Sequence, residues 1–453
     1  MSILTELLKD RLEHYGVPGA SLAVWADGQA QEAVAGVVNL DTKVLVSPDT
    51  LFQIGSITKL YVAVMCLQLV DEGKLTLDDP VRRWLPDFGL ADESVAAKLT
   101  LRHLLSHQSG IEGDYFEDAG RGEDRIAKFV SFFPKIRQVH DLGEMFSYCN
   151  TGFVLAGRLI EVAGGQGWDK AIRTRMAKPL GTPAFSTLPE QAIRYLTAIG
   201  HLGAPGNLTV TPIAYLAQSN APAGSMQMAS ARDIVTFGRM LMNKGTAPNG
   251  TRILSEDSIE AMHTSNVVCP KHLHIDEVGL ATFMWDWDGS GELETYGHDG
   301  STIGQAAWLR YHPKSGSVFA LLTNGGNGKG LAHELMDEFF GTHAGVKPKE
   351  APLPVEGLTF DAARYVGAYA NVMETVKITE EDGALVATII PSPAASVIAG
   401  KRRVPLSPVN EELFVGVAPG YTETATYHFL KPDAQGRAKY LHSGVRAHKR
   451  VTM

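Results

Sequence analysis

"FQIGSITKLY", residues 52–61, contains a serine and a lysine three positions apart, Ser56 and Lys59. From Ser56 onward, apolar residues recur about every 3.6 positions, which predicts a helix from residue 56 to about 72. Gly73 follows, at a point where a helix end favours a residue that tolerates positive φ. Because positions i and i+3 share one face of a helix, the serine hydroxyl and the lysine amine can meet at its N-terminus.

This pairing indicates a nucleophile and its base. A serine hydroxyl reacts slowly until a base takes its proton, and a lysine with an unperturbed pKa of ~10.4 can do so only where burial or nearby positive charge keeps it neutral. A helix N-terminus also supplies N–H groups and a positive dipole end, which favour an oxyanion beside the serine. The spacing also occurs by chance, with the serine as an N-cap and the lysine in solvent.

Charge and composition exclude several classes of protein. The chain has 453 residues, 44% hydrophobic and 20% charged, as in ordinary soluble globular proteins. Its formal net charge of -9 and its lack of clustered Lys and Arg argue against a nucleic-acid-binding or membrane-binding surface. We therefore expect neither nucleic acid nor membrane as a partner.

Residues 1–19 place charged side chains inside an apolar pattern, which predicts an amphipathic helix rather than a signal peptide. No uninterrupted apolar stretch reaches the ~18 residues of a membrane span. Cys66, Cys149 and Cys269 are too few and too scattered for a disulfide framework. We expect a cytoplasmic protein, with removal of a native leader as the alternative.

The first 345 residues predict a domain of the α+β class. Residues 19–40 alternate between apolar and polar and contain an Asp-Gly turn, which predicts an antiparallel hairpin. A helical, loop-rich region spans about residues 75–240, and strand patterns return at 305–326, followed by a further helix. These patterns predict an antiparallel sheet flanked by helices, with a helical region inserted between its parts.

The rest of the chain differs in kind. Residues 346–354, VKPKEAPLP, predict an extended linker because they are rich in proline and lack periodicity. Short alternating runs separated by turn residues such as Asp382-Gly383 fill residues 355–453. They predict a small antiparallel β-barrel or sandwich. The expected division is 1–345, 346–354 and 355–453.

Five blocks resemble, in order, those of the class C β-lactamase and penicillin-binding-protein-like serine hydrolases, for which S-x-x-K is a hallmark. The resemblance covers about residues 10–342 and implies a β-lactamase/transpeptidase-like fold. The C-terminal segment resembles the lipocalin-like tail of some family peptidases, which narrows the active-site cleft or builds oligomers. The blocks are LFQIGSITKLYVAVMCLQLVDEGKLTLDDPVRRWLP (51–86), LTLRHLLSHQSGI (99–111), FSYCNTGFVLAGRLIEVAGG (146–165), APAGSMQMASARDI (221–234) and YGHDGSTIGQAAWL (296–309).

The resemblance implies roles for four residues. Ser56 is the expected acylated nucleophile and Lys59 its partner. Tyr148 and Asn150 match the family's Tyr-x-Asn: the phenol is expected to shuttle the proton, and the amide to hold Lys59 and the substrate carbonyl side. A phenol with a pKa of ~10 needs a nearby cation to act as a base, so Tyr148 and Lys59 form one coupled unit. A core tyrosine at a helix start is the alternative for Tyr148.

The third motif is His298-Asp299-Gly300, where the family has Lys-Thr-Gly or His-x-Gly on an edge strand. Gly300 lets substrate lie close to the strand, and the N–H of Ser301 is expected to join that of Ser56 in an oxyanion hole. True β-lactamases place a lysine at the first position, which helps to bind the drug's carboxylate. A mostly neutral histidine binds a carboxylate weakly, which favours the family's esterases, amidases and D-amino-acid peptidases. Strand packing is the alternative role of His298.

Other clusters give weaker signals. Two histidine-containing groups have spacings that can hold zinc, but neither has a complete ligand set, so we expect no metal. Residues 325–330, GGNGKG, lack the spacing and the final Ser or Thr of a P-loop. Several aromatic residues lie where they could line the pocket or pack in the core. The residues in question are His103 and His107; Cys269, His272, His274 and Asp276; and Tyr115, Phe116, Trp285, Trp287 and Tyr296.

The sequence therefore predicts a serine hydrolase that attacks an ester or amide of a small molecule or peptide through a Ser56 acyl-enzyme. It requires neither a metal nor an organic cofactor. A homo-oligomer is compatible with the C-terminal tail. Two alternatives stay open: an acyltransferase of secondary metabolism that uses the same acyl-enzyme, and a non-catalytic relative that binds ligands or forms filaments.

Overall fold

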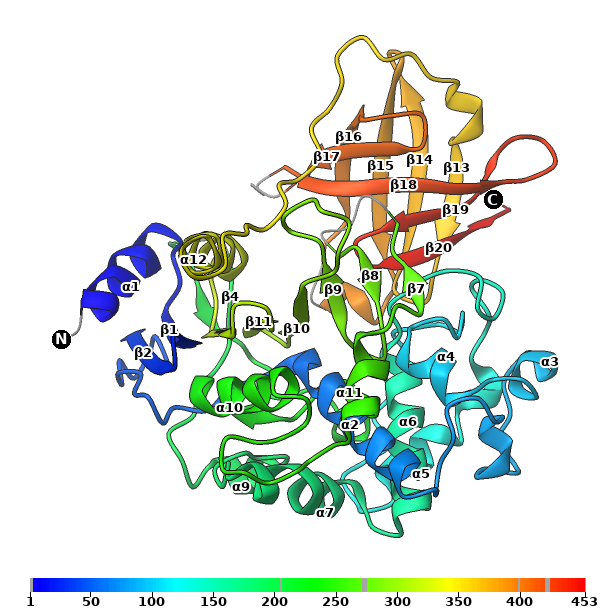
Figure 1. Ribbon diagram of the computed structural model, residues 1–453. Helices are drawn as coiled ribbons and strands as arrows, with labels where there is room; N and C mark the ends of the chain where they lie inside the picture. Colours follow the sequence, from blue (N-terminus) through cyan, green and yellow to red (C-terminus); the bar gives the residue numbers. More distant parts are fainter. Residues whose placement is uncertain (1–2, 204–205, 271–274, 398–399, 420–423, 453) are drawn as a thin grey trace.

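The computed structural model describes residues 3–203, 206–270, 275–397, 400–419 and 424–452. Within them, eight strands form one antiparallel sheet in the order β2-β1-β12-β11-β10-β9-β8-β7 (Figure 1). The expected hairpin at residues 19–40 is present as β1 and β2, and β1 pairs with β12 from the far end of the domain. The strands are β1 Gly19–Ala26, β2 Gln29–Gly36, β7 Val267–Val268, β8 Glu277–Val278, β9 Phe283–Trp285, β10 Thr295–Ser301, β11 Ala306–His312 and β12 Ser317–Thr323.

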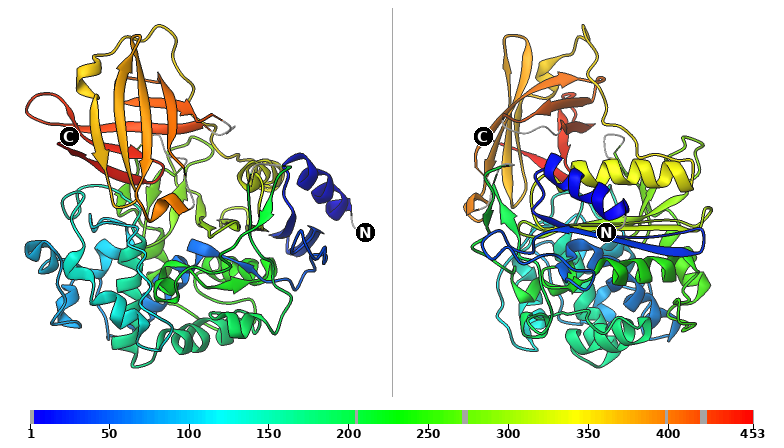
Figure 2. Two further views of the ribbon diagram at one scale, coloured as in Figure 1. Left: turned by 180° about the vertical axis from the view of Figure 1, so that it is seen from behind. Right: turned by 90° about the vertical axis from the view of Figure 1, so that its left-hand side faces the viewer.

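Helices cover both faces of this sheet (Figure 2). The amphipathic helices α1 (Ile3–His14) and α12 (Gly328–His343) cover one face, where Leu8 and Leu12 share an apolar cluster with the core of α12. Helix α10 (Ala231–Met242) packs on the other face, against β1, β11 and β12. The sheet is therefore buried on both sides, as the strand patterns and flanking helices predict.

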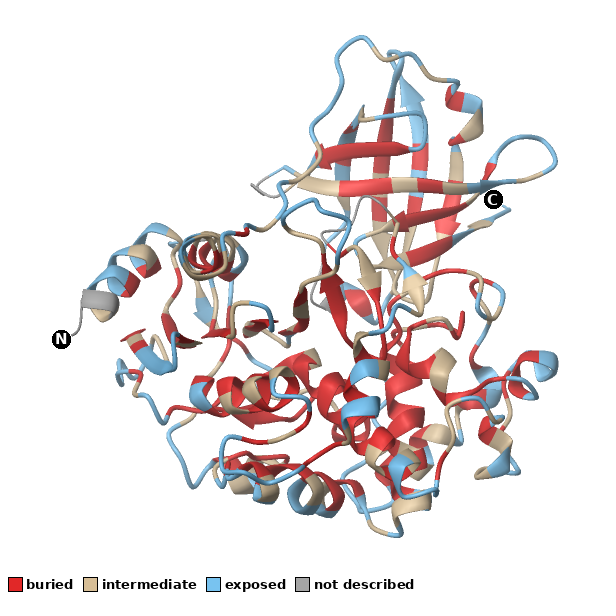
Figure 3. Ribbon diagram, in the orientation of Figure 1, coloured by how far each residue is buried: buried red, intermediate tan, exposed pale blue. Residues whose placement is uncertain are grey.

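The helix of the S-x-x-K motif runs through the core. A 3₁₀ turn at Gly55–Ile57 leads into α2 (Thr58–Asp71), whose residues from Thr58 to Leu67 are all buried (Figure 3). Gly73 adopts a φ of 69° and ends the helix, as expected. Because α2 contacts protein on every side, its apolar residues surround it rather than form one stripe.

Helix α6 (Asn150–Gly164) packs against α2 and begins two residues after Tyr148. It belongs to the helical region expected at about residues 75–240. The Cys149 thiol caps its N-terminus by accepting a hydrogen bond from the Gly152 N–H over 3.2 Å. The other helices are α3 Glu93–Ala96, α4 Leu101–Leu105, α5 Arg125–Val130, α7 Trp168–Ile172, α8 Lys178–Leu180, α9 Pro189–Ala192 and α11 Glu256–His263.

The C-terminal strands form a closed antiparallel barrel in the order β13 to β20, and β13 pairs with β20 to close it. The expectation of a barrel or sandwich thus resolves to a barrel. The short strand β13 was not predicted, because its four residues include two alanines and a glycine and give little alternation. The strands are β13 Gly367–Ala370, β14 Glu374–Glu381, β15 Ala384–Pro391, β16 Arg402–Pro408, β17 Leu413–Val417, β18 Thr424–Pro432, β19 Ala438–Ser443 and β20 Arg446–Val451.

Two short pairings flank the main sheet: β3 (Phe52–Gln53) with β6 (Met228–Ala229), and β4 (His201–Leu202) with β5 (Thr209–Val210). Among the residues described, no helix is long and apolar enough to cross a membrane. The division of the chain at residues 346–354 stays a prediction.

Candidate active site

Three backbone segments meet around Ser56. Each approaches the others at a glycine: Gly55, Gly300 and Gly224. A Cβ atom on Gly55 would lie 2.5 Å from the Ser301 nitrogen, and one on Gly300 would lie 2.0 Å from the Ile54 oxygen. The resemblance singled out Gly300 for substrate access, but here it also lets β10 approach the turn before α2. The same contact brings the backbone of Ser301 beside the turn that holds Ser56.

Ser56 and Lys59 lie together, as their spacing predicts. The Lys59 Nζ is 2.9 Å from the Ser56 Oγ. It also donates hydrogen bonds to the Asn150 Oδ1 and the Ala223 backbone oxygen, each over 2.6 Å. The structure therefore brings together two residues of the first sequence block, one residue of the third and a backbone oxygen of the fourth.

The Lys59 amine is fully buried, with an exposed fraction of 0%. Burial lowers its pKa well below the ordinary value; the charge of Asp114 opposes this shift and that of Arg446 reinforces it. A neutral amine has two N–H donors and one lone pair. In that neutral form, the Asn150 and Ala223 oxygens, which can only accept, would take the two N–H groups and leave the lone pair for the Ser56 hydroxyl.

Asp114 fixes the orientation of the Asn150 amide. The Asn150 Nδ2 donates to the Asp114 Oδ1 over 2.7 Å. A carboxylate only accepts, so the amide nitrogen must face Asp114 and the amide oxygen must face Lys59. Asp114 is itself 5% exposed. Sequence reasoning missed Asp114, which lies just beyond the second block and belongs to no motif.

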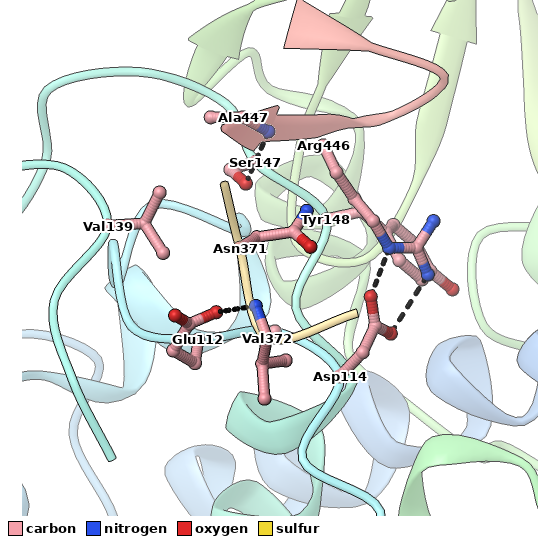
Figure 4. Close-up of a pocket in the computed structure, with 10 residues that line it drawn as sticks. Glu112, Asp114, Val139, Ser147, Tyr148, Asn371, Val372, Arg446 and Ala447 are labelled. Atoms are coloured by element: carbon pink, nitrogen blue, oxygen red, sulfur yellow. Dashed lines mark hydrogen bonds and ion pairs between the residues drawn. The ribbon is translucent and has the colours of Figure 1, made fainter. Parts of the chain in front are cut away.

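Arg446, also missed, reaches this network from the barrel strand β20 (Figure 4). Its Nη2 donates to the Asp114 Oδ1 over 2.9 Å, and its Nε donates to the Asp114 Oδ2. The guanidinium also lies over the Tyr148 ring, with its Cζ 5.3 Å from the ring centroid. The sequence offered no signal for this contact, because Arg446 is one of several basic residues in an alternating strand.

Tyr148 lies within the same cluster. The Lys59 Nζ is 4.9 Å from its ring centroid, and the His107 ring stacks on it at a centroid distance of 4.4 Å. Burial raises the pKa of the Tyr148 phenol, whereas a hydrogen bond with Ser56 and the charge of Arg446 act in the opposite direction. The Tyr148 phenol thus lies close to the Ser56 hydroxyl.

His298 is placed beside the site but buried. Its exposed fraction is 1%, its ring stacks on Phe283 at a centroid distance of 4.1 Å, and its Nδ1 donates to the Asp299 backbone oxygen. Burial lowers the pKa of His298 well below its usual range, so the ring is neutral at pH 7. His298 therefore packs in the strand core and also lies beside the site, with its ring 5.9 Å from that of Tyr148.

The expected edge strand is a partial one. Strand β10 lies between β9 and β11, which corrects the simple edge position that the resemblance implied. However, β9 pairs only with Thr295–Gly297, so among the described residues β10 has no β9 partner from His298 to Ser301. The half-strand with the His-Asp-Gly motif lies beyond this pairing because β9 begins at Phe283, which pairs with Gly297.

The weaker candidates have structural roles. His103 completes a capping box at the start of α4, and His107 accepts a hydrogen bond from the Cys149 N–H over 2.9 Å. His272 and His274 lie outside the described residues. Among the residues that are described, no group of His, Cys, Asp and Glu could hold a metal ion. Trp285 is buried in an apolar cluster with Tyr148.

The comparisons with known proteins assign the chain to a family. Residues 4–337 match the family model described as Beta-lactamase. Penicillin-binding protein 4 of Amycolatopsis lactamdurans is 42% identical over 365 residues, which cover 79% of this chain and 94% of that protein. The chain therefore belongs to the Beta-lactamase family, a family of β-lactamase-like serine hydrolases.

Solved structures resemble the chain to different extents. The crystal structure of SurE superposes with a TM-score of 0.80 at 29% identity and covers 99% of this chain and 98% of its own. SurE with D-Leu gives a TM-score of 0.76 at 27% identity, with 98% of each chain covered. A D-stereospecific amidohydrolase from Streptomyces sp. gives 0.59 at 27%, with 74% of this chain and 99% of that chain covered. The similarity to SurE thus includes the barrel.

Proposed function

We propose that the chain is a hydrolase that cleaves ester or amide bonds of small molecules or peptides through an acyl-enzyme on Ser56. The observation that supports this best is the hydrogen bonding of Lys59. Its buried Nζ lies 2.6 Å from the Asn150 Oδ1 and from the Ala223 oxygen and 2.9 Å from the Ser56 Oγ, so a neutral amine that donates to the two acceptors has its lone pair available for the serine. That arrangement suits a base that takes the serine proton.

In the acylation step, the Ser56 Oγ attacks the carbonyl carbon while its proton passes to Lys59, either directly or through the Tyr148 phenol. The tetrahedral intermediate then collapses, the bond to the leaving alcohol or amine breaks, and the leaving group takes up the proton. Water attacks the resulting ester in the second half-reaction and restores Ser56. Lys59 and Tyr148 act as one unit because they lie on the same proton path from Ser56, with the Lys59 Nζ 4.9 Å from the Tyr148 ring centroid.

The backbone supplies the remaining parts. We assign the oxyanion hole to the N–H groups of Ser56 and Ser301, which the close approach at Gly55 and Gly300 brings to one place. Asn150 holds Lys59 and faces the substrate's carbonyl side. His298 lines the site without a charge, so it favours neutral substrates over carboxylate-bearing ones.

We further propose that the acyl group comes from a D-configured amino acid. Two of the similar structures involve D-configured groups: SurE with D-Leu and a D-stereospecific amidohydrolase. Both are 27% identical to this chain in sequence, and SurE with D-Leu covers 98% of it. A fold alone does not define a substrate, so this part rests on similarity rather than on a contact in the site.

Turnover of matched enantiomers tests the proposal. D-leucine p-nitroanilide should be cleaved with a kcat/KM at least about tenfold above that of L-leucine p-nitroanilide, a difference of ~1.4 kcal/mol in transition-state binding. An equal rate for the two would contradict the proposed stereochemistry. Product analysis with and without an added amine separates hydrolysis from the acyltransferase alternative. A homo-oligomer and a cytoplasmic location stay predictions, the former testable by light scattering.

A further inference from the structure

A continuous chain of hydrogen bonds runs from the barrel to the base of the proposed reaction. It leads from Arg446 to Asp114, from Asp114 to Asn150, and from Asn150 to Lys59. We propose that Arg446 is a positioning residue, which acts through Asp114 to orient the Asn150 amide and to balance the charge beside Lys59. This inference rests on the proposed function. It gives the barrel a role in orienting the proposed base Lys59.

The geometry at Asp114 leaves little freedom. Its Oδ1 accepts from the Arg446 Nη2 over 2.9 Å and from the Asn150 Nδ2 over 2.7 Å, and its Oδ2 accepts from the Arg446 Nε. Such a bidentate fork fixes the plane of a carboxylate as well as its charge. Among the described residues, Arg446 is the cation that forms an ion pair with Asp114. Without it, a carboxylate that is 5% exposed would lie uncompensated in the interior.

The two charges act on Lys59 in opposite directions. The negative charge of Asp114 favours the ammonium form of Lys59, and the positive charge of Arg446 disfavours it. When both charges are present, their effects on the pKa of Lys59 oppose each other, and burial is then the main influence on the protonation state of the amine. With Asp114 alone, the carboxylate would favour a protonated lysine and so oppose its use as a base.

Backbone contacts on both sides of Arg446 hold it in place. The Tyr148 N–H donates to the Val445 oxygen over 2.8 Å, and the Ala447 N–H donates to the Ser147 Oγ over 3.1 Å. The barrel hairpin therefore pairs with the segment that bears the Tyr-x-Asn motif. These contacts join residues about 300 positions apart in the sequence and deliver the arginine in a set orientation.

A second anchor lies across a small pocket from Arg446 (Figure 4). The Val372 N–H, in the turn between β13 and β14, donates to the Glu112 Oε2 over 2.8 Å. Glu112 is two residues before Asp114, so the barrel is tied to the same loop at two points. The barrel thus fixes both the loop that presents Asp114 and the strand that presents Arg446.

The test is the pH dependence of kcat/KM for a p-nitrophenyl ester. Because the active base is neutral Lys59, the rate falls on the acid side as the amine becomes protonated. Arg446→Met should raise the pKa of Lys59 and move this acid limb to higher pH by about one unit or more. Asp114→Asn, which keeps an amide oxygen for Asn150, should move the limb to lower pH.

The double variant, with both charges removed, should return the acid limb toward that of the wild type. Arg446→Lys, which keeps the charge but loses the fork, should keep the position of the limb while lowering kcat. Arg437→Met is the matched control, because Arg437 is a barrel arginine paired with Asp433 within its own turn. It should leave the pH profile unchanged.

The single variants predict shifts of opposite sign, so either one that folds decides the question. A folded variant with a lower melting temperature but an unmoved acid limb would overturn the inference, because Arg446 would then only hold the barrel. Covalent labelling of Ser56 in the wild type is a separate readout. If Ser56 is labelled and the limb does not move, the positioning role alone fails; if Ser56 is not labelled, the proposed function fails.

Discussion

A Cβ atom on Gly224 would lie 2.2 Å from the backbone oxygen of Gly55, the residue directly before the candidate nucleophile. Gly224 also adopts a φ of 113°, a conformation that L side chains rarely reach. Its neighbour Ala223 provides the oxygen that accepts from Lys59. The loop at Gly224 therefore helps to fix how closely Lys59 and Ser56 approach each other.

Gly224→Ala should therefore reduce activity by displacing the backbone around Ser56. We expect kcat/KM to fall by about 10², the size of effect that a displacement of ~1 Å at a reacting group can cause. Gly73→Ala is the matched control: Gly73 also has positive φ, but its added Cβ would meet nothing within 4 Å. That variant should lose about 1 kcal/mol of stability and keep its kcat/KM.

Lys59→Ala and Tyr148→Phe should each lower kcat/KM for an activated ester by about 10² to 10⁴, the usual range for loss of general acid–base catalysis. The double variant should lose much less than the product of the two effects, because the residues share one proton path. Steady-state kinetics of the four proteins measure this. Fully multiplicative losses would mean that the two side chains act independently.

His298 should set the preference for neutral substrates. A charge-assisted hydrogen bond to a carboxylate contributes roughly 1.5–3 kcal/mol, and a neutral histidine cannot make one. Short-chain p-nitrophenyl esters should therefore be turned over at least about tenfold better in kcat/KM than nitrocefin. His298→Lys should move this ratio toward nitrocefin, and the uncharged His298→Gln should not. An unchanged ratio in the lysine variant would remove His298 as the determinant.

Acid should destabilise the protein through His263. Burial lowers the pKa of His263 to about 4, whereas an unfolded histidine titrates near 6.5. Since the unfolded state binds the proton first, the contribution of His263 is complete above about pH 6.5 and is lost as pH falls toward 4. The loss amounts to about 3 kcal/mol. Urea unfolding at several pH values should show a shallower pH dependence for His263→Gln than for the wild type.

Local patterns predicted much of the architecture. The hairpin at residues 19–40, the helix after Ser56, the helical region at about residues 75–240 and the C-terminal barrel all follow from periodicity or resemblance. These features depend on neighbouring residues, and the 3.6-residue or two-residue repeat records them directly. The position of Lys59 beside Ser56 follows in the same way, because it needs only one turn of helix.

Contacts distant in the sequence could not be predicted. Arg446 and Asp114 are 332 positions apart, and neither belongs to a motif. The half of β10 that β9 does not pair with depends on where β9 begins, and a strand of three residues leaves little pattern in the sequence to show that point. The orientation of Asn150 likewise required the structure, because it is set by Asp114 from another loop.

The most direct test of the account is intact-protein mass spectrometry after incubation with a fluorophosphonate. The wild type should gain one covalent adduct, located on the peptide that contains Ser56. Ser301→Ala, which removes a hydroxyl but keeps the backbone N–H assigned to the oxyanion hole, should be labelled like the wild type. Ser56→Ala should gain no adduct, and labelling that persists in Ser56→Ala would contradict the central claim that Ser56 is the nucleophile.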